Sequence, residues 1–276
     1  MQIHSLSKVL GLPFVLLALI ILYYSSYVER SYSIYIFIPV FFIVALYVFH
    51  GVIDHWWRTK FPIKFDPNLR RWLNEHFPYY VSLLENEKSI FEYRLGLYID
   101  ARLFKSVGSE IKEVPEDIKC MVAAHGIQMT MATNDFLIGD IDRIYLYKHP
   151  FPTPDHQFLH TVETNSEDGV IILSLEQLTH AILNPSKYYN VAYHAYAEAF
   201  ICVNNTINFP DCENTWASLT KVCGFTLEIL IQQTGYQSLP ILPIHITCFF
   251  NNSDNYKQIF PDHFERFSQI FCQRQL

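Results

Sequence analysis

Two long apolar runs without charged residues open the chain. The first covers residues 9–25 (VLGLPFVLLALIILYYS) and the second covers residues 33–53 (SIYIFIPVFFIVALYVFHGVI). Each approaches the ~20 apolar residues that a helix needs to cross the hydrocarbon core of a bilayer. We therefore predict a two-helix transmembrane hairpin over residues 1–58, with its turn at Tyr27–Ser31. A cleaved signal peptide is the rival interpretation of the first run, and a buried hairpin of a soluble protein is the rival for both.

Basic residues gather on one flank of the predicted hairpin. After the second run come Arg58, Lys60, Lys64, Arg70 and Arg71. The turn holds one arginine balanced by one glutamate, and the N-terminal segment holds a single lysine. By the positive-inside rule we expect a two-pass membrane protein with both termini and the main domain in the cytoplasm. The aromatic segment His55–Trp57 is then expected at the membrane surface.

Beyond the hairpin, the period of the apolar positions changes from helical to alternating and back. A juxtamembrane connector is expected over residues 59–80, with Asp66 as N-cap of a short helix. Apolar positions at three- and four-residue steps predict helices over residues 83–104, 115–132, 187–203 and 211–235, and from about residue 262. Short β-branched and aromatic segments predict strands over residues 142–151, 158–164 and 169–174. Ser174 and Gln177 form a capping box that starts one more helix. The predicted class is α+β, mostly helical with a small sheet, and the main domain is expected over residues 81–276.

Composition narrows the classes of function. Half of the 276 residues are hydrophobic, which is slightly high for a soluble globular protein, and the excess over such a protein lies in the two N-terminal runs. The net charge of −7 has no basic stripe, so we expect no nucleic-acid partner. The six cysteines form no C-x-x-C pair, so no zinc finger is predicted, and in the cytoplasm they should stay reduced.

A near-motif stands in the predicted helix 187–203. The segment HAYAE, His194–Glu198, has the length of the metallopeptidase motif H-E-x-x-H but not its sequence. On a helix, His194 and Glu198 lie one turn apart on the same face, which is what a metal needs from its first two ligands. The spacing alone leaves two interpretations open, an ordinary polar pair and a residual metal site.

Several segments outside the near-motif resemble, in order and spacing, the family of the Mlc titration factor, the MtfA-like zinc-dependent peptidases. They are FEYRLGLYIDARLF at residues 91–104, MVAAHGIQMTMATNDFLIGDIDRIYLYKHPFPTP at 121–154, and GVIILSLEQLTHAILNPSKYYNVAYHAYAEAF at 169–200. A later segment, ITCFF at residues 246–250, resembles the family's S-E-x-F-F. The resemblance implies a zincin-like peptidase domain and, for a bacterial relative, attachment to the inner membrane.

The resemblance can be carried over position by position, and it implies that several zinc-site residues of the family are replaced in this chain. His194 matches the first zinc ligand, Ala195 stands where the general base belongs, Glu198 replaces the second histidine, and Thr247 replaces the third ligand, a glutamate. His245 or His180 could supply a ligand only by turning inward. Without the base, acid–base help of ~10²–10⁴ in rate is lost.

These substitutions lead to three hypotheses. We expect a pseudoenzyme without a cofactor, a membrane-anchored module that binds a cytoplasmic protein or peptide. The alternative is an active metallopeptidase in which His194, Glu198 and His245 hold zinc and another carboxylate acts as the base. The second alternative is a structural membrane scaffold.

Overall fold

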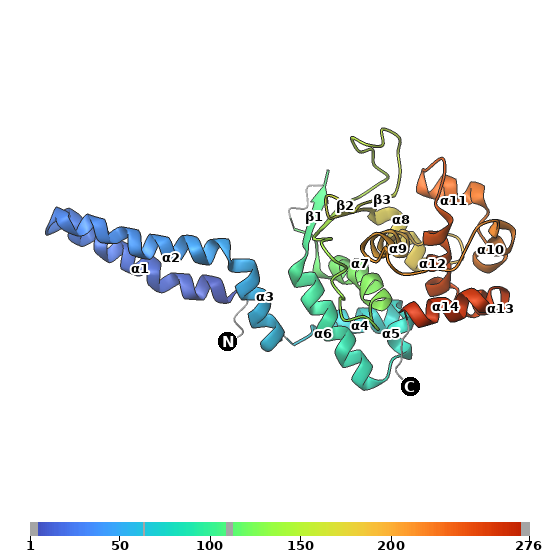
Figure 1. Cartoon of the computed structure of the whole chain (residues 1–276), viewed down its shortest axis with the longest axis horizontal. Helices are drawn as coiled ribbons and strands as arrows, with labels where there is room; N and C mark the ends of the chain where they lie inside the picture. The colour runs from blue at the N-terminus through green and yellow to red at the C-terminus, as the bar shows by residue number, and fades with distance from the viewer. Residues whose placement is uncertain (1–4, 63, 109–112, 272–276) are drawn as a thin grey trace. The chain divides into compact units, whose positions relative to one another are not determined.

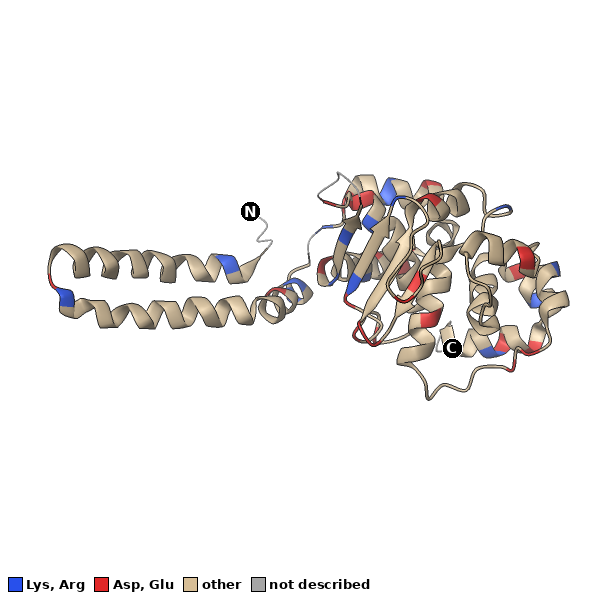
Figure 2. Ribbon diagram, turned by 90° about the horizontal axis from the view of Figure 1, so that it is seen from above, with Lys and Arg blue, Asp and Glu red and all other residues tan. Residues whose placement is uncertain are grey.

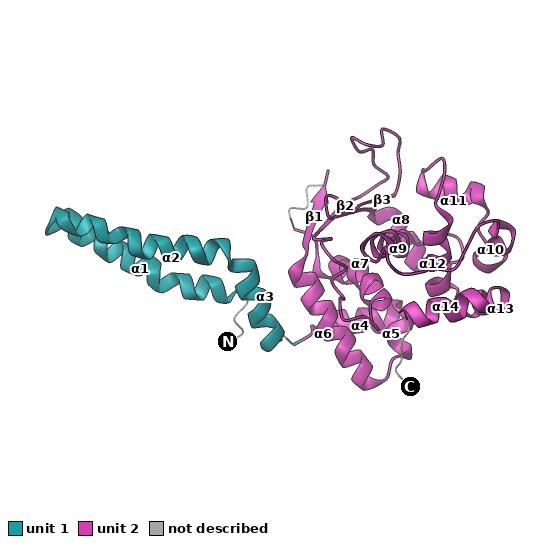
Figure 3. Ribbon diagram, viewed as in Figure 1, with its two compact units in different colours: residues 1–64 teal, residues 65–276 magenta. Residues whose placement is uncertain are grey.

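The computed structural model describes residues 5–62, 64–108 and 113–271. The chain divides into two compact units, residues 1–64 and residues 65–276 (Figure 3).

Unit 1 is a helical hairpin built from the two apolar runs (Figure 1). Its elements are α1 (Leu6–Tyr27), the 3-10 helix η1 (Arg30–Ile36), α2 (Phe37–Val48) and α3 (His50–Lys60). The α1 helix and the continuous η1–α2 segment are long and apolar enough to cross a membrane, with mean hydropathies of 2.3 and 2.1. Charged residues lie only near the ends of these helices and in α3 (Figure 2). The second helix ends at Val48 rather than near residue 53, because the backbone leaves the helical region at Phe49.

Asp54 on α3 is hydrogen-bonded to the first residues of α1. One carboxylate oxygen accepts a hydrogen bond from the Ser7 backbone N–H at 2.8 Å, and the other accepts from the hydroxyls of Ser5 and Ser7 at 2.7 and 2.9 Å. The first N–H groups of a helix have no partner within their own helix. Asp54 therefore caps α1 from a distant part of the sequence, and its charge complements the helix dipole.

A small sheet forms one layer of unit 2. Its strands are β1 (Leu103–Val107), β2 (Arg143–Tyr147), β3 (Val162–Asn165) and β4 (Val170–Ser174), in the order β1-β2-β4-β3. The first two pairings are parallel, and β3 runs antiparallel to β4. The three predicted strands are present. The sequence analysis missed β1, because the short LFKSV segment directly follows the helix that ends at Ala101.

Unit 2 also contains eleven helices in its described part. They are α4 (Pro67–His76), α5 (Pro78–Ser82), α6 (Glu85–Ala101), α7 (Glu116–Met129), α8 (Leu175–Leu183), α9 (Val191–Val203), α10 (Trp216–Cys223), α11 (Leu227–Thr234), α12 (Ile241–Asn251), α13 (Ser253–Ile259) and α14 (Pro261–Phe271). Of these helices, α6, α8 and α9 pack directly against the sheet. This architecture confirms the predicted α+β class.

The central helix is α9, which packs against α7, α8, α12, β3 and β4 (Figure 1). Its side chains are almost all buried, from Val191 to Phe200. A glycine lets α7 approach it closely: a Cβ on Gly126 would lie 2.8 Å from the Tyr196 ring. The near-motif therefore lies in the core of unit 2.

Predicted boundaries in unit 2 also differ from the structure. The single helix expected over residues 211–235 is two helices, because Gly224 adopts a left-handed conformation with φ +76° and ends α10. Within the expected connector, α4 and α5 belong to unit 2, since Leu69, Leu73 and Tyr80 are buried in its core. Asp66 caps α4 as predicted, accepting from the Asn68 N–H.

A buried carboxylate joins α4 and α5 to α6. Glu92 accepts two hydrogen bonds from Arg70, both at 2.7 Å, and one from the Tyr80 hydroxyl at 2.5 Å. Burial by itself would raise the pKa of Glu92, but the hydrogen bonds from Arg70 and Tyr80 outweigh burial and lower this pKa. The stabilisation is therefore complete above the ordinary range of a glutamate and is lost as the pH falls through the lowered value.

We expect Glu92→Gln to destabilise unit 2 by about 1–3 kcal/mol at neutral pH. Breaking a buried ion pair costs about 3–5 kcal/mol, and this estimate is reduced because Arg70 is half exposed. Chemical denaturation of the full-length protein in detergent, at neutral and at acidic pH, measures the loss, which should shrink as the pH falls through the lowered pKa of Glu92. Tyr80→Phe is the control, since it removes one hydrogen bond, about 1 kcal/mol, and keeps the carboxylate. An equal loss at both pH values would contradict the assigned ion pair.

Candidate functional site

The α9 helix begins immediately before the near-motif. Asn190 is its N-cap, and the Asn190 side chain accepts hydrogen bonds from the Ala192 and Tyr193 N–H groups. On this helix His194 is 1% exposed and Ala195 is completely buried. The Glu198 side chain is 28% exposed, so it alone of the three reaches the surface.

A chain of hydrogen bonds surrounds His194. Its Nδ1 lies 2.7 Å from the Tyr189 hydroxyl, which donates to Thr247 Oγ1 at 3.1 Å. Thr247 in turn donates to the Pro243 carbonyl at 2.8 Å. Burial raises the pKa of Tyr189 well above its ordinary value, so its hydroxyl keeps the proton that it donates. The structure therefore brings Thr247 to His194 through Tyr189, a residue to which the sequence analysis assigned no role.

Glu198 completes this set of polar groups. Its carboxylate lies 3.3 Å from Nε2 of His194, one helical turn away. Burial would raise the pKa of Glu198, but the interaction with His194 outweighs burial and lowers it. The predicted pair of His194 and Glu198 is thus brought together.

Neither His245 nor His180, the two histidines considered as alternative ligands, lies beside His194. His245 lies two residues before Thr247 on α12, so its side chain points about 200° away around the helix. Its Nε2 and Nδ1 lie 2.8 Å from Thr215 Oγ1 and 2.6 Å from the Tyr256 hydroxyl. His180 lies on α8 with its ring 4.7 Å from that of Tyr188.

The residues around His194 do not fit a catalytic zinc ion. Two ligands of one metal could share the 3.3 Å spacing of His194 and Glu198. A catalytic zinc site, however, needs three protein ligands and a base beside its bound water. The third position is Thr247, whose hydroxyl is bonded to Pro243 and Tyr189, and the base position is the methyl group of Ala195.

Glu198 faces a cavity of about 480 Å³. Four of its lining residues are acidic, Asp155, Glu163, Glu167 and Glu198, and none of the described lining residues is lysine or arginine. Glu163 is held in place by Thr153 and His160, at 2.7 and 2.8 Å. The cavity is therefore suited to a positively charged ligand. Glu163 lies in β3, next to Val162, and the sequence analysis assigned it no role.

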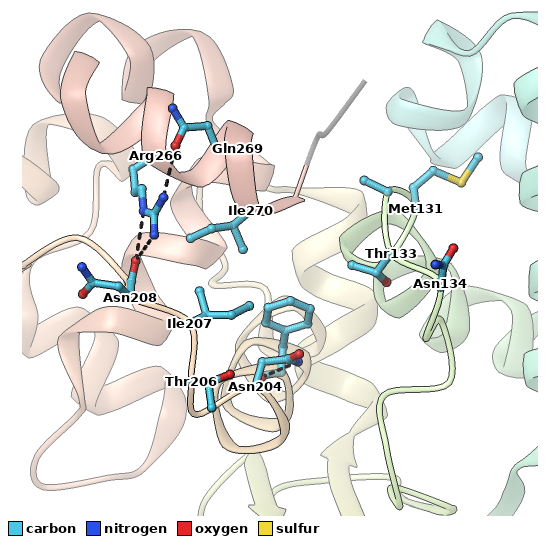
Figure 4. A pocket seen from close by; sticks show the side chains of 12 residues that line it. Met131, Thr133, Asn134, Asn204, Thr206, Ile207, Asn208, Arg266, Gln269 and Ile270 are labelled. Carbon is cyan, nitrogen blue, oxygen red and sulfur yellow. Dashed lines mark hydrogen bonds between the residues drawn. The ribbon is translucent and has the colours of Figure 1, made fainter. Parts of the chain in front are cut away.

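A larger cavity, of about 1070 Å³, lies elsewhere in unit 2 (Figure 4). It is lined by Met131, Phe200, Asn204 and residues of α14, among them Arg266, which donates two hydrogen bonds to the Asn208 carbonyl at 3.0 and 2.8 Å. Neither His194 nor Glu198 lines it. We therefore assign the candidate site to the smaller cavity beside Glu198.

Comparison with known families gives one match. The sequence profile of the glucose-regulated metallo-peptidase M90 matches residues 54–208, more than half of the chain, and this range contains His194, Ala195 and Glu198. Thr247 and His245 lie beyond it. Comparison with curated proteins gives no match.

Proposed function

The chain belongs to the glucose-regulated M90 metallopeptidase family, and we propose that it is a membrane-anchored member that binds a peptide or protein segment without hydrolysing it. Family membership confirms the resemblance drawn from the sequence.

The observation that carries the proposal is the buried methyl group of Ala195. A zinc peptidase needs a carboxylate directly after its first histidine to take a proton from the metal-bound water. Ala195 is completely buried and can neither accept nor donate a proton. Thr247 supports the same conclusion, because a hydroxyl hydrogen-bonded to Pro243 and Tyr189 stands where the resemblance expects a glutamate ligand.

The acidic cavity gives the proposed module its ligand class. A segment carrying lysine or arginine would place its charge against the partly exposed Glu198, which lines the cavity. Unit 1 supports the anchoring, since both of its apolar segments have the length of a membrane span and their basic residues lie mainly after the second one. We propose the cytoplasmic face as the location of unit 2 on this basis.

A second candidate function follows from the spacing of His194 and Glu198. At 3.3 Å these groups could share one metal ion, as an active metallopeptidase with a rearranged site would require. Such a site needs a third ligand, and His245 is bonded to Thr215 and Tyr256 instead. We therefore place this function second.

Metal analysis and a peptidase assay test the absence of hydrolysis. We expect the purified full-length protein in detergent to show no chelator-sensitive hydrolysis of casein or aminopeptidase substrates. We also expect His194→Ala to leave the metal content unchanged. If wild-type protein hydrolyses these substrates and His194→Ala abolishes both the activity and a stoichiometric zinc, the second function is correct.

Binding of a lysine- and arginine-rich peptide tests the ligand class. Glu198→Gln should weaken binding about fivefold, because a partly exposed ion pair contributes on the order of 1 kcal/mol. Glu265→Gln is the matched control, since it removes the same charge from an exposed position of α14 outside the cavity. Equal affinities of the two variants would exclude the cavity as the binding site.

A further inference from the structure

Three metal-donor side chains meet in unit 2 away from the near-motif. Cys212 lies in the loop between α9 and α10, His245 on α12 and His263 on the first turn of α14. One donor atom of each lies within 4.8 Å of the other two. Among the described residues, these three are the group of histidine, cysteine or acidic side chains that lie close enough together to hold a metal ion. It contains neither His194 nor Glu198.

His245 is oriented for ligation through one nitrogen. The Tyr256 hydroxyl lies 2.6 Å from Nδ1, and a partner of this kind fixes the ring orientation of a metal-bound histidine. Nε2 lies on the side of Thr215, whose hydroxyl donates to the Cys212 carbonyl at 2.6 Å. The Thr215 hydroxyl can therefore give up its 2.8 Å contact with Nε2 and keep its own hydrogen bond.

His263 has a buried polar atom without a partner. Its Nδ1 is inaccessible to solvent and makes no hydrogen bond within the described chain. Its ring is stacked on Phe260, at 5.3 Å and 6°, and lies 5.6 Å from the ring of His245. A buried nitrogen without a partner is destabilising, and a ligand at this point would supply the missing partner.

We propose that Cys212, His245 and His263 bind one zinc ion. One thiolate and two imidazoles are ligands that zinc prefers, and a tetrahedral ion accepts them with a fourth position left for water. Ligands of one zinc lie roughly 3.5 Å apart, so small side-chain rotations suffice from 4.8 Å. Binding breaks the S–H bond of Cys212, forms the metal–sulfur bond and releases the proton to solvent.

The proposed ion has a structural role. It joins three segments far apart in the sequence: the loop after α9, helix α12 and helix α14. The α12 helix also carries Thr247, so the ion would hold in place the helix that packs against α9. Entry is from the side of His263, which is partly exposed, whereas Cys212 and His245 are buried.

Metal titration of the full-length protein in detergent tests this site. We expect one zinc per chain in wild-type protein and in His194→Ala. We expect at least tenfold weaker binding in Cys212→Ser and His263→Gln. Cobalt should give a sulfur-to-metal charge-transfer absorption that Cys212→Ser removes. Cys202→Ser is the matched control, since Cys202 is exposed on α9, and it should keep the band.

His263→Gln keeps the test decisive if Cys212→Ser fails to fold, because His263 is partly exposed. Zinc that remains bound in His263→Gln would overturn the proposal, as would a cobalt complex without the thiolate band. Zinc lost in His194→Ala but retained in Cys212→Ser would place the metal at the near-motif instead. That outcome would contradict the proposed function as well, whereas loss of zinc in His263→Gln leaves the proposed function untouched.

Discussion

Ala195→Glu is expected to lower the free energy of unfolding by about 3–5 kcal/mol and to produce no peptidase activity. Ala195 is 0% exposed. A carboxylate at this position would be a buried charge without a compensating partner. The Ala195 carbonyl accepts from Thr164 at 3.3 Å, so β3 covers this part of α9. Restoring the general base alone also leaves Glu198 and Thr247 at the positions of the second and third ligands.

Ala195→Leu separates the cost of charge from the cost of volume. Leucine adds bulk without charge, and overpacking costs about 1–3 kcal/mol. Chemical denaturation of both variants should show the glutamate variant as the less stable one. A casein assay with and without chelator measures activity. Chelator-sensitive hydrolysis by Ala195→Glu would mean that His194 and Glu198 already hold a metal and lack only the base.

Gly235→Ala is expected to destabilise unit 2 by about 2–5 kcal/mol. Gly235 ends α11 in a left-handed conformation with φ +85°. A Cβ here would lie 2.1 Å from the Leu159 carbonyl oxygen and 2.7 Å from the His160 Cα, both backbone atoms that cannot rotate away. The strain of a left-handed alanine costs about 1–2 kcal/mol, and displacing the neighbouring backbone costs about 1–3 kcal/mol more.

Gly224→Ala is the matched control for this prediction. Gly224 also ends a helix, at φ +76°, but a Cβ there would meet nothing within 4 Å. We expect a loss of about 1–2 kcal/mol from strain alone. Thermal or chemical unfolding of the two variants measures the difference, which reports the contact of α11 with the loop at residues 158–161. Equal losses would show that this contact contributes little. Displacement of His160 should also weaken peptide binding, since His160 holds Glu163 at the cavity.

Much of the fold could be predicted from local patterns. The two uncharged runs identify the helices of unit 1, because each has the length and the apolar composition of a membrane-spanning helix. The alternating segments predict β2, β3 and β4, and the caps at Asp66 and Ser174 confirm two helix starts. The split of α10 from α11 could have been read from Gly224. The strand β1 could not, because five residues after a helix carry too little periodicity and gain their strand conformation from pairing with β2.

The sequence by itself determined the family and placed His194 and Glu198 on one helix face with Ala195 after the histidine, since each depends on residue identity and on spacing along one helix. Only the tertiary structure decided the rest. In the folded chain His245 lies beside Cys212 and His263 and not beside His194. The Tyr189 hydroxyl lies between His194 and Thr247. These contacts join segments from separate helices and loops. Their geometry depends on how α9, α12 and α14 pack, and no periodicity within one segment records that packing.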